Sequence, residues 1–466
     1  MLSLFEEILS GFPPSLPNAN PAKGQQAVST TGQDDLPSWF AVTDLAVGSI
    51  ATAGLMLARF VETSLNTPAL PITNGSIIVD RRLASFWFGM TLRPIDWEIP
   101  PAWDPIAGDY RTKDGWIRLH TNAPLHRKAA LSVLGQYNDR AALESIVAKW
   151  SADELEDAIM EANGCAATMR DLVSWEQHPQ GHAVSQDPLI IWNNHGTVDV
   201  KRHNPQPTRP LSGIKVLDLT RVLAGPVAGR FLAAYGADVL RIDPPIWEEP
   251  GVIPEVTLGK RCAELDLKDK NDRTIFEKLL SEADVLLHGY RPQALIGLGY
   301  DPETLRSINP GIIDVSLNAY GWSGPWSNRR GFDSLVQMSC GIADFGMAMS
   351  DADKPVPLPV QALDHATGYL LAGAILHSLR EYRQTGKVLS ARLSLARVAH
   401  LLCQTQRPIL SKGLHPETPE DISPEIEKTS WGLAQRIKFP LTIEGIPSFW
   451  NYPASALRSS QPVWLD

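Results

Sequence analysis

The feature that most constrains the fold is a regular alternation that runs from Leu211 to about Leu393. Short runs of β-branched and aliphatic residues alternate there with segments of helical spacing. This order is typical of a parallel sheet whose strands are joined by right-handed crossover helices, with a ligand crevice at the carboxyl ends of the strands. The predicted strands are residues 214–219, 238–243, 263–267, 284–288, 312–316 and 388–393, and the predicted helices are residues 227–235, 272–282, 302–307 and 364–381.

The first 200 residues follow a different pattern. A helix is predicted over residues 43–62, and the proline-rich segment 97–105 marks a boundary. Residues 110–120, YRTKDGWIRLH, predict a hairpin with Asp114-Gly115 at its turn. The predicted fold class is therefore α/β, a Rossmann-like parallel sheet core with helices on both faces, plus a smaller α+β domain.

Charge and hydropathy limit the partners that we expect. With 42 Lys and Arg against 52 Asp and Glu, the chain has a net charge of −10, which argues against nucleic acid or an anionic membrane as a partner. The most apolar stretch, residues 45–58, is shorter than the roughly 20 residues of a membrane span, so it predicts a buried core helix. Acidic residues stand near the start, where a signal peptide has positive charge, and a cytoplasmic protein is therefore expected.

The four cysteines lie far apart and include no C-x-x-C pair. This spacing predicts neither a zinc site nor a disulfide framework, and no metal is expected.

Two features of the core point to an anionic ligand. The loop TRVLAGPVAG, residues 220–229, has small residues before a helix, where backbone N–H groups can bind phosphate, although a plain tight turn explains it equally well. Lys260 and Arg261 precede the third strand and Arg291 follows the fourth, and we expect their loops to converge at one edge of the sheet. Each of these cations taken alone is typical of a solvated surface charge.

Asp364 opens the long apolar helix of residues 364–381. Asp is favoured at helix N-termini, so the pattern alone favours capping over catalysis. The neighbouring His365 is interpreted as structural.

Several strings in the second half resemble the class III CoA-transferases. They are LSGIKVLDLTRVLAGPVAGRFLAAYGADVLRID, GKRCAELDLKD, EADVLLHGYRPQALIGLGYD, NPGIIDVSLNAYGWSGP and GFDSLVQMSCG, and they stand in that family's own order. The family includes formyl-CoA and carnitine CoA-transferases and the α-methylacyl-CoA racemases. The resemblance extends from Leu211 to His400.

The resemblance implies a role for specific residues. The string D-x-x-x-G at Asp364 to Gly368 matches that of the family's nucleophile, which moves CoA from an acyl-CoA to a carboxylic acid through an aspartyl anhydride and an aspartyl-CoA thioester. CoA and acyl-CoA would then be substrates, with no permanently bound cofactor, and a homodimer is possible. The positions that match the family's CoA contacts are Arg221, Val222, Leu223, Ala224, Lys260, Arg261, Gly289, Tyr290, Arg291 and Tyr320.

The order of the parts departs from that family, because the small domain precedes the core. Asp44 and Gly48 also repeat the D-x-x-x-G string, although Asp364 has the better case because it follows the core. The predicted segments are an N-terminal helix and tether (1–36), a helical segment echoing the nucleophile helix (37–105), the small α+β domain (106–200), the Rossmann-like CoA-binding core (201–345), and the nucleophile helix with the C-terminal segment (346–466).

Two alternatives stay open. Racemases of the family have a GHD string whose His is a base, and Gly331-Phe332-Asp333 lacks that imidazole, which argues against an acyl-CoA racemase or isomerase. The rearranged order of the parts and the replaced loop residues, such as Leu223 and Asn318, motivate the other alternative, a catalytically silent CoA-binding protein, although active transfer stays ahead of it.

Overall fold

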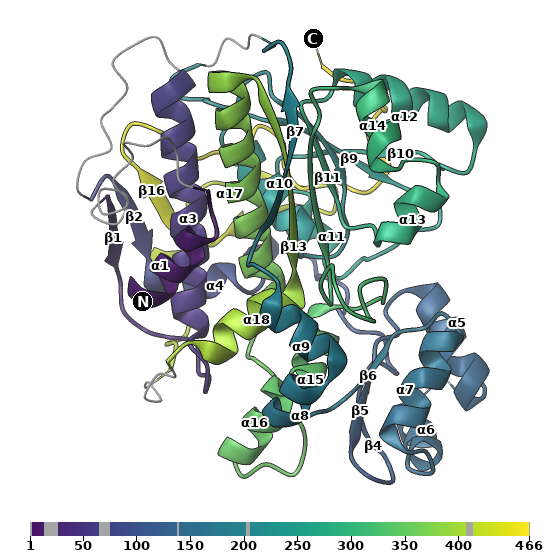
Figure 1. Cartoon of the computed structure of the whole chain (residues 1–466). Coiled ribbons are helices and arrows are strands. Elements are labelled where there is room, and N and C mark those ends of the chain that lie inside the picture. Colours follow the sequence, from purple (N-terminus) through teal and green to yellow (C-terminus); the bar gives the residue numbers. More distant parts are fainter. Residues whose placement is uncertain are drawn as a thin grey trace.

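A seven-stranded mixed sheet lies at the centre of the computed structural model, which describes residues 2–13, 27–64, 75–137, 139–201, 206–406 and 413–465 (Figure 1). The strand order is β10-β9-β8-β11-β12-β13-β7, and only β7 is antiparallel to its neighbour. The bounds are β7 Ile191–Thr197, β8 Lys215–Leu219, β9 Asp238–Asp243, β10 Arg261–Glu264, β11 Val285–His288, β12 Ile313–Asn318 and β13 Lys387–Ser394. The predicted parallel core is confirmed, and part of the predicted tether, residues 14–26, lies outside the described residues.

Both faces of this sheet are covered, because alternate side chains of each strand point to opposite sides. Val216 of β8 joins a large apolar cluster with α10 (Ala224–Ala234), α17 (Ala362–Thr385) and α3 (Val42–Ser64). Its neighbour Leu217 joins a second cluster with α12 (Lys270–Glu282), α13 (Pro292–Gly297) and α14 (Pro302–Ile308). The continuous apolar runs in the sequence reflect this burial on two sides.

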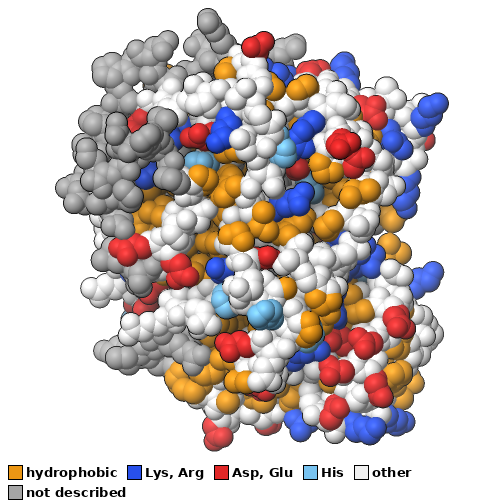
Figure 2. All heavy atoms as spheres, viewed as in Figure 1, with side chains coloured by type: hydrophobic (Ala, Val, Ile, Leu, Met, Phe, Trp, Pro, Cys, Tyr) orange, Lys and Arg blue, Asp and Glu red, His pale blue; other side chains and the backbone are white. Residues whose placement is uncertain are grey.

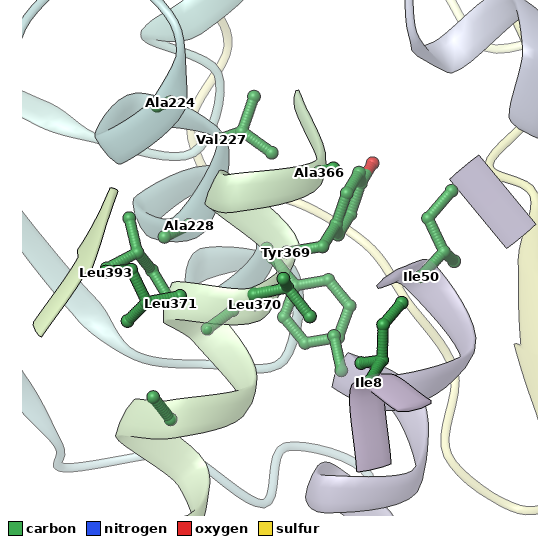
Figure 3. Close-up of a cluster of buried hydrophobic side chains, with 14 of the residues drawn as sticks. Ile8, Ile50, Ala224, Val227, Ala228, Ala366, Tyr369, Leu370, Leu371 and Leu393 are labelled. Atoms are coloured by element: carbon green, nitrogen blue, oxygen red, sulfur yellow. The ribbon is translucent and has the colours of Figure 1, made fainter. Parts of the chain in front are cut away.

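Helix α17 is the centre of the larger cluster. Figure 3 shows Ala366, Tyr369 and Leu370 between the labelled side chains of α10 and Ile50 of α3, with Ile8 nearby. Ile8 belongs to α1 (Leu2–Ser10). The two long helices α3 and α17 lie side by side in Figure 1, and their contact is the most extensive between any two elements. The segment 42–63 is long and apolar enough to cross a bilayer, but 89% of its apolar window is buried inside the fold, as in a core helix.

The small domain lies beside the sheet, at the lower right of Figure 1. Its strands β4 (Gly108–Arg111) and β5 (Trp116–Leu119) form the predicted hairpin, with Thr112 N–H donating to the Gly115 carbonyl at 3.0 Å. The remaining elements are β6 Ala166–Thr168, α5 Pro124–Leu134, α6 Arg140–Val147 and α7 Ala152–Glu161. Helices α8 Leu172–Gln177 and α9 Pro179–Gln186 lead from it to β7.

The C-terminal segment, whose fold the pattern does not predict, closes two small sheets with N-terminal strands. Strand β15 (Leu433–Arg436) pairs with β3 (Leu92–Ile95) and β14 (Glu427–Lys428), and β16 (Leu441–Ile443) pairs with β2 (Ile77–Asp80), which pairs with β1 (Val28–Thr31). The first and last parts of the chain therefore fold together. The other elements are α4 Arg81–Trp87, α11 Ile253–Val256, α15 Asp333–Ser339, α16 Ile342–Met349, α18 Leu395–Gln404 and the 3₁₀ helix Pro419–Asp421.

Candidate active site

A cavity of about 370 Å³ opens at the carboxyl ends of the central strands. Strands β8 and β11 are neighbours there, but the chain leaves β8 toward β9 and leaves β11 toward β12, so a crevice forms between their loops. The lining includes residues 219–222 and 224 after β8, 289–291 after β11, Leu395 after β13, and Asp364 of α17. The predicted crevice at the strand ends is present, and below we call it the main cavity.

Asp364 lies in the first turn of α17, with a residue exposure of 7%. Within the described part of the chain its carboxylate has no hydrogen-bond or ion-pair partner, and Gln361 is the N-cap residue of the helix. Capping therefore does not explain this aspartate. Its carboxylate lines the main cavity.

Gly368 lies about one helical turn after Asp364, where α17 packs closely against α10. A Cβ at Gly368 would lie 2.4 Å from the carbonyl oxygen of Ala224 and 2.7 Å from Cβ of Val227. The missing side chain lets the start of α17 approach α10 and the loop before it, which places Asp364 against the loop at residues 220–224.

Asp333 fixes the start of α17 from the neighbouring helix α15. Its Oδ2 accepts a hydrogen bond from the Asp364 N–H at 2.9 Å, and its Oδ1 accepts one from the Gln337 amide. Burial raises the pKa of Asp333 to about 6. Burial, together with the negative charge of Asp333, raises the pKa of Asp364 well above its usual value.

Cationic side chains line the main cavity together with Asp364. Arg221, Arg291 and Arg330 line it, and among the described residues none of the three forms an ion pair with a carboxylate. The guanidinium of Arg221 lies 4.7 Å from the ring centroid of Trp247 and donates to the Tyr290 hydroxyl. Unpaired guanidiniums in a cleft are typical of a site for phosphate or carboxylate groups.

Arg329 also lines the main cavity, but its guanidinium already has a carboxylate partner. Its guanidinium pairs with Glu156 at 2.9 Å and covers the ring of Trp326 at 3.9 Å.

On the molecular face shown in Figure 2, acidic and basic side chains are interspersed. The main cavity differs from that face, because its lining contains four arginines and a single acidic residue, Asp364.

The loop before α10 has a strained backbone. Val222 has a φ of +65°, in the left-handed region that β-branched residues rarely adopt. Its N–H donates to Glu249 Oε2 at 2.9 Å, so this N–H is not free to bind a phosphate. Such strain persists where surrounding contacts fix it and is frequent at functional sites.

Of the predicted CoA-binding positions, six line the main cavity and four do not. Those that line it are Arg221, Val222, Ala224, Gly289, Tyr290 and Arg291. Leu223, Lys260, Arg261 and Tyr320 lie outside its lining. Tyr320 is buried, and its hydroxyl lies 3.1 Å from that of Ser339.

The expected convergence of Lys260 and Arg261 with Arg291 is not observed. Neither Lys260 nor Arg261 lines the main cavity, whereas Arg291 does. Lys260 Nζ is buried in an ion pair with Asp218 at 2.8 Å, and Arg261 pairs with Asp238 at 2.9 Å. Both cations have structural partners.

Asp44, the competing aspartate, has a different environment. Its carboxylate forms an ion pair with Arg81 at 2.6 Å, and Arg81 also binds Asp35. A Cβ at Gly48 would face Ile8 and Phe5 of α1, so the repeated glycine accommodates α1 where Gly368 accommodates α10. The repeated D-x-x-x-G string therefore shares with Asp364 to Gly368 the close helix packing at its glycine, but its aspartate carboxylate is held in an ion pair.

His126 also lines the main cavity, although no motif in the sequence points to it. It comes from α5 of the small domain, and its buried Nδ1 has no hydrogen-bond partner in the part of the chain that the structure describes. Burial, with Arg330 and Arg291, lowers the pKa of His126 to about 4, so the imidazole is neutral at pH 7. No local motif marks it, because only the fold brings α5 to the strand ends.

His365 has the structural role expected of it. Its ring stacks on Phe88 with centroids 5.3 Å apart, and burial lowers the pKa of His365 to about 3. Among the described residues, no group of three or more His, Cys, Asp or Glu side chains is placed to hold a metal ion.

Comparison with known proteins agrees with this geometry. Residues 211–422 match the family model described as CoA-transferase family III. This part of the chain is similar to members of that family. The match covers the central strands, the loops that line the main cavity, and Asp364.

Curated relatives match the chain in part. The acetyl-coenzyme A transferase of Hypoxylon pulicicidum is 30% identical over 311 residues, which cover 60% of this chain and 51% of that protein. The succinyl-CoA:glutarate CoA-transferase of Mus musculus is 34% identical over 211 residues, covering 42% and 48%. A crystal structure of a Mycobacterium tuberculosis protein has 35% identity and a TM-score of 0.39, covering 42% of this chain and 55% of that one. The chain spans about half the length of the curated relatives that it matches.

Proposed function

We propose that the protein transfers CoA from an acyl-CoA donor to a carboxylic acid acceptor, with Asp364 as the nucleophile. The observation that carries this proposal is the unpaired Asp364 carboxylate, which lines a cavity together with three arginines that have no carboxylate partner among the described residues. A carboxylate held without a structural partner beside an anion-binding surface is suited to attack a bound thioester.

The reaction balances in four steps. An Asp364 oxygen attacks the thioester carbonyl carbon of the donor, the C–S bond breaks, and a mixed anhydride and CoA thiolate form. The thiolate then attacks the Asp364 carbonyl carbon, which releases the donor's carboxylate and leaves an aspartyl-CoA thioester. The acceptor carboxylate attacks this thioester and displaces the thiolate. The thiolate finally attacks the acceptor's carbonyl carbon, so the new acyl-CoA departs and Asp364 is regenerated.

The surrounding residues have distinct tasks in this scheme. Asp333 acts as a positioning residue, because it binds the backbone N–H of Asp364 and holds the first turn of α17. Arg221, Arg291 and Arg330 supply positive charge for the phosphates of CoA and for the acceptor's carboxylate. The raised pKa of Asp364 means that deprotonation precedes attack, so the rate rises with pH.

The test is a transferase assay with a panel of acyl-CoA donors and carboxylic acids. Asp364→Asn keeps the side-chain volume and is expected to lower kcat by about 1,000-fold or more, as removal of a nucleophile does in other enzymes. Asp44→Asn is the matched control, since this aspartate opens the same D-x-x-x-G string in the first turn of α3 but lies in an ion pair, and it is expected to keep most of the activity. Full turnover by Asp364→Asn would end the proposal.

His126 supports a second candidate, an acyl-CoA epimerase or isomerase. Proton transfer at the α-carbon needs two acid/base groups, and the neutral His126 lines the same cavity as Asp364 although the family's GHD histidine is replaced by Phe332. Incubation of acyl-CoA in D₂O separates the candidates. Deuterium at the α-carbon that His126→Gln abolishes would favour epimerisation, and CoA exchange without deuterium favours transfer.

A silent CoA-binding protein is distinguished by calorimetry beside these assays. Micromolar CoA binding without turnover on any donor and acceptor would favour silence. We further propose that the protein acts in the cytoplasm as a homodimer, which light scattering and cell fractionation test.

A further inference from the structure

A second cavity of about 190 Å³ adjoins the main cavity. Three residues, Val222, Trp247 and Phe332, line both cavities and form the partition between them. The second cavity, which we call the side cavity, is bounded by the proline-rich segment 101–104 and by the loop 247–252 that follows β9.

The partition is held in place by specific contacts. Glu249 accepts hydrogen bonds from the strained Val222 backbone and from the Trp247 indole, each at 2.9 Å. The Phe332 ring stacks on His120 with centroids 3.8 Å apart and an interplanar angle of 11°. These contacts hold the three residues of the partition in place.

The two cavities differ in charge. The side cavity has no lysine or arginine in its lining. Its lining has three carboxylates, and each already forms an ion pair with an arginine: Asp104 with Arg127, Glu248 with Arg458, and Glu249 with Arg241. Burial lowers the pKa of His120 well below its usual value, so its imidazole is neutral. The rest of the surface is mainly aromatic side chains, proline and valine. An anionic group would face carboxylates there, whereas an uncharged group would bury apolar surface.

From this contrast we propose that the side cavity binds the acyl group of the donor thioester and selects short, uncharged acyl chains over acyl groups that end in a carboxylate. The proposal rests on the proposed CoA transfer. The guanidiniums of the main cavity hold the phosphates and the acceptor's carboxylate, and the acyl chain extends from the thioester past Phe332 into the side cavity, which has no cationic lining residue. Phe332 thereby becomes a specificity-determining residue.

The test uses thioether analogues, which bind without reacting. Isothermal titration of the wild-type protein with CoA, S-butyl-CoA and S-(3-carboxypropyl)-CoA is expected to show S-butyl-CoA binding at least about tenfold tighter than CoA, since each buried methylene contributes about 0.8 kcal/mol. The carboxylated analogue is expected to bind no tighter than CoA.

Three variants sharpen this test. Val252→Phe fills the side cavity and should remove the advantage of S-butyl-CoA while the affinity for CoA stays within twofold. Trp103→Ala, at a residue that is 40% exposed, widens the side cavity and should shift the preference toward S-octyl-CoA. Ile246→Ala is the matched control, because this side chain is 72% exposed and lies outside both linings.

The outcomes separate the two proposals. If CoA binds and S-butyl-CoA binds no tighter, or if the carboxylated analogue binds tighter than CoA, the acyl site is overturned and CoA transfer stands. If CoA itself does not bind, the proposed function fails and the acyl site fails with it. Loss of the S-butyl-CoA advantage in Val252→Phe alone, with Ile246→Ala unchanged, supports the acyl site.

Discussion

Glu255→Gln is expected to destabilise the protein strongly, because this carboxylate joins three distant parts of the chain. Glu255 is fully buried and accepts hydrogen bonds from the Thr91 N–H at 2.9 Å and the Thr91 hydroxyl at 2.7 Å, both in the N-terminal half. It pairs with Arg230 of α10 and with Arg436 of β15, the latter at 3.3 Å. Removing its charge leaves two buried guanidiniums without their shared partner.

The magnitude follows from the pKa of Glu255. Burial alone would raise this pKa, but Arg230 and Arg436 outweigh burial and lower it from 4.5 to about 2. A difference of about 2.5 units corresponds to about 3 kcal/mol of folding free energy. Because the folded-state pKa is depressed, this contribution is fully present above pH 4.5 and is lost as the pH falls toward 2.

The assay is urea unfolding followed by tryptophan fluorescence at pH 7. We expect Glu255→Gln to lower the free energy of unfolding by about 3 kcal/mol and to flatten its pH dependence between pH 4.5 and 2. Glu444→Gln is the control, since Glu444 is exposed and lies in the same C-terminal segment as Arg436. A loss below about 1 kcal/mol, or an equal loss in the control, would refute the reasoning.

Three further outcomes are expected. Lys260→Met breaks the buried ion pair with Asp218 and should lower the free energy of unfolding by about 3 to 5 kcal/mol. The CoA affinity of the folded variant, measured by calorimetry, should stay unchanged. A loss of CoA affinity without a loss of stability would instead make Lys260 a CoA-binding residue. Asp333→Asn removes the negative charge that raises the pKa of Asp364, so the acid limb of the kcat profile should move to lower pH, and an unmoved limb would contradict the coupling. Burial lowers the pKa of His365 to about 3. Between pH 7 and pH 5 this histidine therefore binds a proton in the unfolded state but not in the folded state, so it alone should lower the free energy of unfolding by about 2 kcal/mol over that range. In His365→Leu, urea unfolding curves should lack this part of the pH dependence.

The core of the fold was predictable because its signals are local. Each strand of the sheet is a short apolar run, and burial on both faces accounts for that pattern, as Val216 and Leu217 show. The pairing of β15 and β16 with N-terminal strands was not predictable, because their pairing partners lie more than 300 residues away and no local pattern encodes the contact.

The candidate site was predictable only where residues follow a strand. Arg221 and Arg291 follow β8 and β11 and therefore line the cavity at the carboxyl edge, whereas Lys260 precedes β10 and its ammonium is buried against Asp218 of β8, outside that lining. His126 and Glu249 could not be found, because the first reaches the main cavity through the docking of the small domain and the second acts through a hydrogen bond to a strained backbone.

Trapping the covalent intermediate tests the central claim most directly. The purified protein is mixed with an acyl-CoA and no acceptor, quenched in acid, digested and analysed by mass spectrometry. We expect CoA as a thioester on the peptide that contains Asp364, and an unmodified peptide in Asp364→Asn. An adduct on the Asp44 peptide, or undiminished CoA transfer by Asp364→Asn, would contradict the assignment of the nucleophile.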